Sequence, residues 1–271
     1  MRSIRGSTIT PVVTGIAFLA AIAGGVRFGQ RHPYYRVGAV RTHGEWVKYA
    51  NAKGDSVRAY VAYPERKDKA PAIIIVHEIY GMTDWEPTVA DRFAGNGYVA
   101  IVPDLLSSQY KSTDSVRTRA TQLVSALPDS QVVGDLNATY KYVNSLAATQ
   151  RGNTGIIGFC WGGGTVWKYA AANPDLKAGV ACYGPVTDTT MLHTVKAPMF
   201  GIYAEGDARV TGMLPGIKAA MDNNHKNFTS SIYTGAGHGF LKPGRTGYGT
   251  PEYDRALRDI DAFFAKQLEH K

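Results

Sequence analysis

Cysteine is scarce in this sequence, and the cysteines present do not form a metal-binding pattern. Cys160 and Cys182 are the only two among 271 residues. Neither lies in a CxxC pair or at a Cys/His spacing typical of zinc sites, so a structural metal site is not expected. No organic cofactor is expected either. Two cysteines of an exported protein can instead form a disulfide, which is one possible fate of this pair.

Three further features are missing: a long linker rich in proline or serine, an internal repeat, and a cluster of basic with aromatic residues. The missing linker favours one large domain, because 271 residues can fold as a single α/β unit. The formal charge is +8, but the Lys and Arg residues are scattered, so no nucleic-acid partner is expected. A basic surface of this kind would attract anionic small molecules weakly.

The N-terminus has the features of a secretory signal peptide. Arg2 and Arg5 provide a basic start, an apolar run follows at residues 11–23, and Ala21 and Ala23 are small residues suited to a cleavage site. The protein is therefore expected to be exported to the periplasm or the extracellular space. A retained N-terminal membrane anchor is the alternative, but the apolar run is short for a membrane-spanning helix, and no span is expected once the leader is removed.

The remainder of the chain alternates short apolar runs with helical patterns. Residues 1–23 are assigned to the signal peptide, residues 24–44 to a linker or surface arm, and residues 45–271 to the folded domain. The alternation of apolar and polar residues predicts a β-hairpin at its start. The hairpin strands are expected at 47–50 and 57–63, the other strands at 72–76, 98–102, 155–159, 177–183, 197–204 and 228–233, and helices at 84–95, 115–127, 131–146, 165–172, 216–224 and 251–268. This order predicts an α/β fold with a mostly parallel central sheet, helices on both faces and an N-terminal antiparallel hairpin.

Glycines surround Cys160 where a strand is expected to turn into a helix. Gly158, Cys160 and Gly162 fill the pattern of glycine, any residue, nucleophile, any residue, glycine, with Cys in the place where Ser is commoner. The glycines are needed because a Cβ at either position would collide with a neighbouring strand or helix. The helix N-terminus would favour a thiolate or an oxyanion. The alternative is a glycine-rich turn with a buried, inert Cys.

Two other polar residues follow later strands and complete a catalytic constellation with Cys160. The loops after the carboxyl ends of parallel strands meet at one edge of the sheet, and three of them carry Cys160, Asp207 and His238. This order of nucleophile, acid and histidine is typical of α/β-hydrolases. The thiolate would attack a carbonyl, His238 would transfer the proton, and Asp207 would orient the imidazole. Alone, Asp207 would more often be a turn residue and His238 a loop residue.

Four motifs carry a resemblance to a known family: residues 77–81 (HEIYG), 158–163 (GFCWGG), 206–210 (GDARV) and 237–240 (GHGF). With them, over about residues 45 to 268, the chain resembles dienelactone hydrolases, which are cysteine-dependent members of the α/β-hydrolase fold. In that family a Glu at the position of Glu78 contacts the resting thiol and takes its proton when substrate displaces it. A carboxylate beside a thiol raises the thiol pKa and offers a proton acceptor, whereas the alternative for Glu78 is a strand-end residue bonded to a loop.

The remaining site residues concern the oxyanion hole and the substrate. The backbone N–H groups of Ile79 and Trp161 would form the oxyanion hole. The family binds a substrate carboxylate with two arginines, whose counterparts here are Arg117 before the elbow and Lys242 four residues after the catalytic histidine. Lys242 cannot present the two-pronged fork of a guanidinium. Tyr80, and with it Trp85 and Tyr110, would line the pocket or serve as packing residues.

These observations predict a hydrolase that cleaves a lactone or small carboxylic ester through an acyl-cysteine, with a small molecule as its partner. One alternative keeps the fold and changes the substrate to thioesters, short peptides or acylated sugars. Another is a non-catalytic secreted binding protein in which Cys160 and Cys182 are joined by a disulfide, because a fold does not determine a function. The oligomeric state is not predicted by the sequence.

Overall fold

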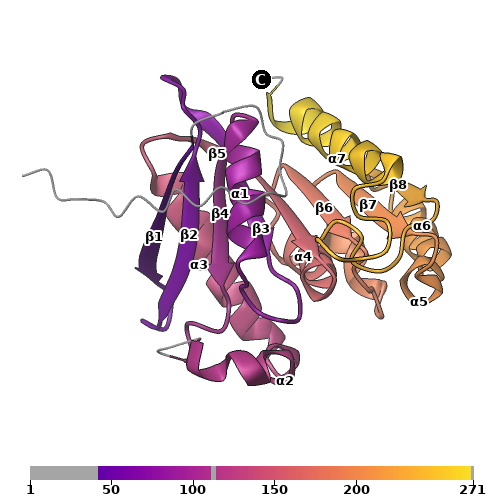
Figure 1. The fold of residues 1–271 in the computed structure, drawn as a ribbon, viewed down its shortest axis with the longest axis horizontal. Coiled ribbons are helices and arrows are strands. Elements are labelled where there is room, and N and C mark those ends of the chain that lie inside the picture. The colour runs from indigo at the N-terminus through magenta and orange to yellow at the C-terminus, as the bar shows by residue number, and fades with distance from the viewer. Residues whose placement is uncertain (1–41, 111–113, 270–271) are drawn as a thin grey trace, which may run out of the picture. The chain divides into compact units, whose positions relative to one another are not determined.

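A mixed sheet forms the centre of the described domain (Figure 1). The computed structural model describes residues 42–110 and 114–269, and within them the sheet has eight strands in the order β1-β2-β4-β3-β5-β6-β7-β8. β1 and β2 form an antiparallel hairpin, β2 and β4 are also antiparallel, and all other neighbours are parallel. The strands are β1 His43–Ala50, β2 Ser56–Tyr63, β3 Ala70–Val76, β4 Val99–Asp104, β5 Thr149–Phe159, β6 Ala178–Cys182, β7 Met199–Ala204 and β8 Phe228–Tyr233.

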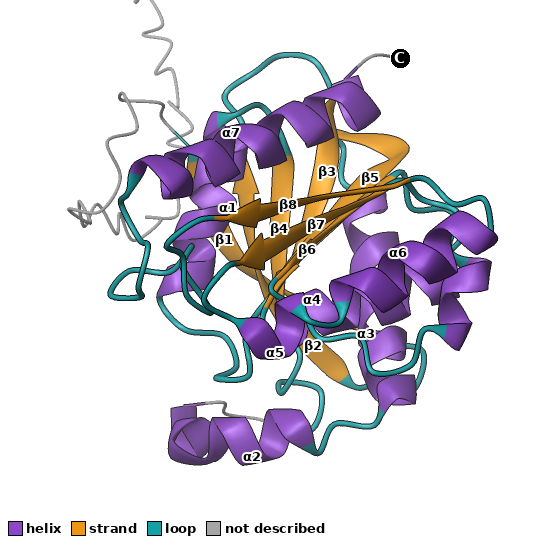
Figure 2. Ribbon diagram, turned by 90° about the vertical axis from the view of Figure 1, so that its right-hand side faces the viewer, coloured by secondary structure: helices purple, strands orange, loops and turns teal. Residues whose placement is uncertain are grey.

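Helices cover both faces of this sheet (Figure 2). α1 and α7 pack on one face through Phe93 and Phe264, and α3 and α4 pack on the other through Leu136 and Trp167. The helical elements are α1 Trp85–Gly95, η1 Asp114–Arg119, α2 Ala120–Ser125, α3 Asp129–Ser145, α4 Trp161–Ala172, η2 Thr190–Thr194, α5 Ala208–Thr211, α6 Leu214–Asn223, α7 Pro251–Phe264 and a π-helical turn η3 Ala265–Glu269. The predicted α/β architecture is therefore confirmed.

The burial of the strands explains why their sequences are apolar without interruption. Every residue of β3, β4, β6 and β7 is buried, because helices cover both sides of these strands. Along β3, successive side chains point to opposite faces, so that Ile73 and Ile75 join the core under α1 and α7 while Ile74 and Val76 join the core under α3 and α4. β1 is mostly exposed at one end of the sheet.

Several predicted boundaries differ from the structure. β1 begins at His43, four residues before the strand predicted at 47–50, because the exposed first half of an edge strand lacks the apolar alternation used to find it. The single helix expected at 115–127 is a 3₁₀ turn followed by the short α2. The predicted signal peptide and most of the predicted linker lie outside the described residues. Among the described residues, no helix is long and apolar enough to cross a membrane.

The turn from β5 into α4 brings backbone segments into very close contact. A Cβ built on Gly158 would lie 2.2 Å from the carbonyl oxygen of Gly162, and one built on Gly162 would lie 2.4 Å from the carbonyl oxygen of His77. Atoms this close overlap, so no side chain larger than hydrogen fits at either position. The predicted collision at both glycines is confirmed.

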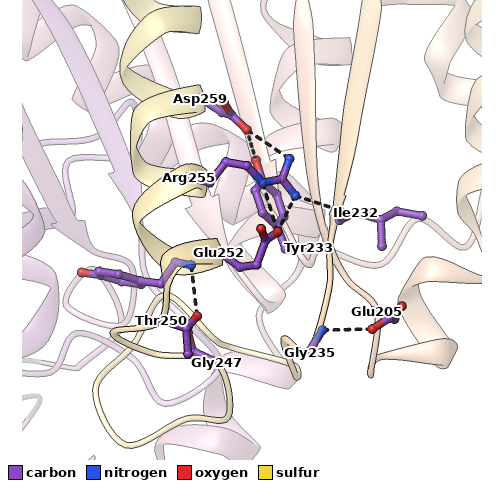
Figure 3. A network of polar contacts seen from close by, with 10 residues as sticks. Glu205, Ile232, Tyr233, Gly235, Gly247, Thr250, Glu252, Arg255 and Asp259 are labelled. Carbon is purple, nitrogen blue, oxygen red and sulfur yellow. Dashed lines mark hydrogen bonds and ion pairs between the residues drawn. The ribbon is translucent and has the colours of Figure 1, made fainter.

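Arg255 of α7 connects this helix to β8 through hydrogen bonds and a ring contact (Figure 3). Its guanidinium donates to the Glu252 carboxylate at 2.6 Å and to the backbone carbonyl of Ile232 at 3.1 Å. It also lies 4.3 Å from the centre of the Tyr233 ring, whose hydroxyl donates to Asp259 at 2.8 Å. Because the partners come from both elements, the network fixes the helix relative to the strand.

The loop between β8 and α7, residues 234–250, is held near both ends. The backbone N–H of Gly235 donates to the Glu205 carboxylate at 2.9 Å, and the Thr250 hydroxyl accepts a bond from the N–H of Tyr253 at the start of α7 (Figure 3). A loop anchored in this way can hold a functional side chain at a defined place. It carries His238.

Candidate active site

Cys160 lies at the end of β5 and directly before α4, with a backbone conformation that is rare for a residue with a side chain. Its φ of 55° and ψ of −115° lie outside the common regions, at a cost of roughly 1–3 kcal/mol. The surrounding backbone holds it there, because its N–H donates to the carbonyl of Cys182 at 3.0 Å and its own carbonyl accepts from Gly164. The side chain is half-buried at the N-terminus of the helix.

Asp207 and His238 form a short, direct hydrogen bond although 31 positions separate them in the chain. The imidazole Nδ1 and Asp207 Oδ2 are 2.5 Å apart. Asp207 is buried and caps α5 by accepting the N–H of Val210 at 3.4 Å, so its carboxylate is fixed. The ring of Tyr183 packs edge-on against His238 with the centroids 5.2 Å apart. The Asp207 carboxylate and the Tyr183 ring therefore both restrict the orientation of the imidazole.

The pKa of His238 depends on Cys160. The pKa of His238 is raised to about 8, chiefly because a hydrogen bond with the Cys160 side chain favours the imidazolium. Burial lowers this pKa, and the hydrogen bond and charge of Asp207 raise it further. The structure thus brings together the three residues Cys160, Asp207 and His238, which the sequence places in separate loops.

Glu78 lies just beyond β3 and forms a buried ion pair. Only 2% of this residue is exposed, and Lys242 Nζ donates to its Oε2 at 2.8 Å. Among the described residues its side chain makes no hydrogen bond to Cys160. The Lys242 ammonium also lies 5.0 Å from the centre of the Trp85 ring and 5.5 Å from that of Tyr80. Lys242, proposed from the sequence as a substrate-binding residue, is thus already engaged by a carboxylate.

Tyr80 is exposed beside this ion pair and is held by a residue that the sequence did not point to. Arg245 Nη2 donates to the Tyr80 hydroxyl at 3.2 Å, and the Arg245 stem passes 3.5 Å from where a Cβ of Gly239 would lie. The pKa of Arg245 is raised, first by the bond to Tyr80 and further by the charges of Glu78 and Cys160. Arg245 therefore lies within electrostatic reach of the candidate nucleophile.

The other predicted substrate-binding residues occupy different surroundings. Arg117 lies in η1, is exposed, and lines a small cavity together with Tyr80. Trp85 is buried and packs edge-on against Phe159 with the ring centroids 4.8 Å apart. Tyr110 is partly buried and packs against the core cluster that includes α3 and α4. Trp85 and Tyr110 thus have packing roles, and Arg117 remains close to Tyr80.

The two predicted oxyanion donors lie on adjoining segments. Ile79 follows Glu78 in the loop after β3, and Trp161 is the first residue of α4. Neither N–H donates to a backbone carbonyl within residues 42–110 and 114–269. The first N–H groups of a helix have no partner within the helix, so that of Trp161 can bind a ligand atom.

Both cysteines are free thiols in the structure. Cys182 is completely buried, and burial raises the pKa of its thiol well above the ordinary range. The disulfide considered from the sequence is absent between these two described residues. No group of three or more His, Cys, Asp or Glu side chains within the described ranges is arranged to hold a metal ion.

Comparison with known proteins decides the family. The model of the dienelactone hydrolase family matches residues 57–268. The chain belongs to the dienelactone hydrolase family. A Salmonella typhi protein named "Putative carboxymethylenebutenolidase" is 35% identical over 214 residues, which cover 73% of this chain and 78% of that protein. A Bradyrhizobium protein named "Probable 2-oxo-3-(5-oxofuran-2-ylidene)propanoate lactonase" is 29% identical over 216 residues, 75% of this chain and 86% of that one.

A solved structure agrees with this family. The Klebsiella pneumoniae protein described as a "Putative Dienelactone Hydrolase" superposes with a TM-score of 0.76 at 27% identity, covering 83% of this chain and 99% of that one. The resemblance inferred from the motifs and the α/β-hydrolase fold are therefore confirmed. The protein is an enzyme of the hydrolase class.

The raised pKa of His238 can be tested with a Cys160→Ala variant. Removing the thiol deletes the main cause of the upward shift, while burial still lowers the pKa and Asp207 still raises it. We expect the His238 pKa, followed by NMR titration of the imidazole protons, to be near 8 in the wild type and lower in the variant. An unchanged pKa in the variant would show that Cys160 does not interact with His238.

Proposed function

We propose that the protein cleaves a lactone or a small carboxylic ester through an acyl-cysteine intermediate. The proposal is carried by one observation: the strained Cys160 lies beside an imidazole whose pKa it raises and which Asp207 binds at 2.5 Å. A base next to a nucleophile, itself oriented by a third group, is the arrangement needed for nucleophilic catalysis.

Each residue of the site has one task in the proposed reaction. Cys160 Sγ attacks the carbonyl carbon as a thiolate, with its proton held by His238, and a tetrahedral oxyanion forms. The imidazolium protonates the leaving alkoxide, and the acyl group remains on sulfur. A water molecule then attacks the thioester carbonyl while His238 takes its proton. The second tetrahedral intermediate expels the Cys160 thiolate as the C–S bond breaks, the proton remains on His238, and the acid product leaves. Asp207 keeps the tautomer and stabilises the imidazolium throughout. The N–H groups of Ile79 and Trp161 donate hydrogen bonds to the oxyanion in both halves of the reaction.

Glu78 is proposed to control the ionisation of the thiol. Its carboxylate is buried and balanced by Lys242 at 2.8 Å, so loss of either partner would leave an unpaired buried charge. A carboxylate close to a thiol favours the protonated thiol. We infer that the ion pair with Lys242 stabilises the negative charge of Glu78. Lys242 is then not available to bind an anionic group of the substrate.

The anionic group of a substrate is then proposed to meet Arg245. Among the described residues Arg245 has a hydroxyl partner and no ion pair with a carboxylate, whereas Lys242 is already paired. A guanidinium offers a carboxylate two parallel bonds. The Bradyrhizobium relative is named for a lactone that carries a propanoate group. We propose a lactone or ester bearing a carboxylate as the substrate, with Tyr80 and Arg117 beside it.

Export is proposed separately from the catalytic role. The basic start and the apolar residues 11–23 support a signal peptide. We expect mass spectrometry of protein taken from the periplasmic fraction of an expressing bacterium to find an N-terminus at Gly24. A product that retains Met1 would contradict cleavage and favour an anchor.

The nucleophile is tested by substitution and by labelling. Cys160→Ala and His238→Ala are each expected to reduce kcat for a chromogenic acetate ester by at least about 1000-fold, while circular dichroism shows native secondary structure. Iodoacetamide is expected to label Cys160 with a matching loss of activity. Cys182→Ala provides the control, because its buried thiol does not face the reaction and the variant should keep its activity. Full activity after labelling of Cys160 would contradict the acyl-cysteine.

Charge recognition is tested with Arg245→Gln. We expect KM for a carboxylate-bearing lactone to rise about 10-fold, with kcat unchanged, because the guanidinium binds the substrate without touching the reacting atoms. KM for a neutral acetate ester should not change. Arg151→Gln is the matched control, since Arg151 is exposed near the opposite end of β5 from Cys160. Equal effects of Arg245→Gln on the charged and neutral substrates would contradict this role.

A further inference from the structure

His77 is a completely buried polar residue beside the site that has no part in the steps above. It lies between the end of β3 and Glu78, and none of its surface is exposed. Its ring makes three contacts: Nδ1 is 2.7 Å from the carbonyl oxygen of Glu78, Nε2 is 3.4 Å from the backbone nitrogen of Leu105, and the ring stacks on Trp161. A buried histidine with both nitrogens engaged has a fixed orientation.

The contacts also fix which nitrogen of His77 carries the hydrogen. The backbone N–H of Leu105 can only donate, so Nε2 must accept. The hydrogen of a neutral imidazole is then on Nδ1, which donates to the Glu78 carbonyl. Because a carbonyl oxygen can only accept, both bonds agree with this one tautomer.

The Glu78 carbonyl accepts a bond from the His77 ring and, at 3.1 Å, one from the N–H of Gly81, and these two bonds determine how the next N–H is directed. The carbonyl of Glu78 and the N–H of Ile79 belong to one planar peptide unit, which is trans because the described residues contain no cis peptide bond. In a trans peptide these two groups point in opposite directions. Holding the oxygen toward His77 therefore holds the N–H of Ile79 away from it.

The same ring contacts the segment that supplies the second donor. The rings of His77 and Trp161 are stacked, with centroids 5.6 Å apart and planes at 13°. The backbone of His77 also meets the start of α4, since a Cβ built on Gly162 would lie 2.4 Å from its carbonyl oxygen. One buried residue thus touches both peptide segments whose N–H groups are assigned to the oxyanion.

We propose that His77 is a positioning residue that sets the direction of the Ile79 N–H and its separation from the Trp161 N–H. The inference rests on the proposed ester or lactone cleavage, because that reaction forms an oxyanion. His77 touches neither substrate nor Cys160 in this role. Its contribution appears in the transition state, where the oxyanion carries charge, and not in binding of the neutral carbonyl.

The test compares two substitutions of His77. His77→Leu fills similar space but removes both hydrogen bonds, and we expect kcat for the acetate ester to fall about 10- to 100-fold, with KM unchanged. His77→Asn places an amide N–H where Nδ1 was, so it should recover about 10-fold of this loss. Melting temperatures of both variants establish that they fold.

Two controls separate positioning from general damage. Alkylation of Cys160 by iodoacetamide needs the nucleophile but forms no oxyanion, so its rate should be the same in the wild type, His77→Leu and His77→Asn. Thr154→Val removes a buried hydroxyl bonded to Asn144, where β5 pairs with the first half of β3, and should lower stability while keeping kcat.

Each outcome bears on one proposal. Wild-type kcat in His77→Leu overturns the role of His77, as does a loss of kcat matched by an equal loss of alkylation rate, which would place its effect on the thiol. Failure of Asn to improve on Leu overturns the hydrogen bond as the cause. A wild-type protein that cleaves no ester refutes the proposed function and, with it, this inference.

Discussion

The close backbone contact around the β5–α4 turn is the constraint on which the site depends. Gly162 lies against the end of β3, and Gly163 against the end of β6, so closely that built Cβ atoms would be 2.4 Å and 2.6 Å from carbonyl oxygens. A Cβ on Gly184 would lie 2.1 Å from the backbone of Gly163. Two strands and a helix therefore meet without side chains between them, and Cys160 is left with φ 55° at their junction. The strained backbone of Cys160 is therefore a consequence of the close packing of the glycines around it.

Charge is distributed unevenly across the site, and burial explains the distribution. Glu78 is almost completely buried, and its negative charge would be costly without the Lys242 ammonium at 2.8 Å. The Asp207 carboxylate and the Cys160 thiol together raise the pKa of the His238 imidazole. Toward solvent, Arg245 rests on the Tyr80 hydroxyl. The two carboxylates, Glu78 and Asp207, are buried and paired, whereas Arg245, which has no carboxylate partner, is exposed.

Features with a fixed spacing along the chain could be predicted from the sequence. Contacts between loops that are distant in the chain could not. Apolar runs and glycines predicted the parallel strands and the turn at Cys160, and the order of Cys160, Asp207 and His238 predicted their meeting. The pairing of Glu78 with Lys242 joins residues 164 positions apart, which no local pattern encodes. Arg245 was missed because the loop after β8 folds back over Gly239. His77 was identified only as part of a motif, because its hydrogen bond to the carbonyl of the next residue cannot be predicted from a sequence pattern.

The Arg255 network has a consequence for association between molecules. β8 is the last strand at its end of the described sheet, and the backbone of an edge strand is a template onto which another chain can add a strand. The Arg255 guanidinium already occupies the Ile232 carbonyl, and it brings a positive charge to this margin. The Ile232 side chain is exposed. Without Arg255, this edge of the sheet would therefore present an apolar side chain next to an unpaired backbone carbonyl. Part of the margin is thereby blocked against strand addition and the aggregation that can follow from it.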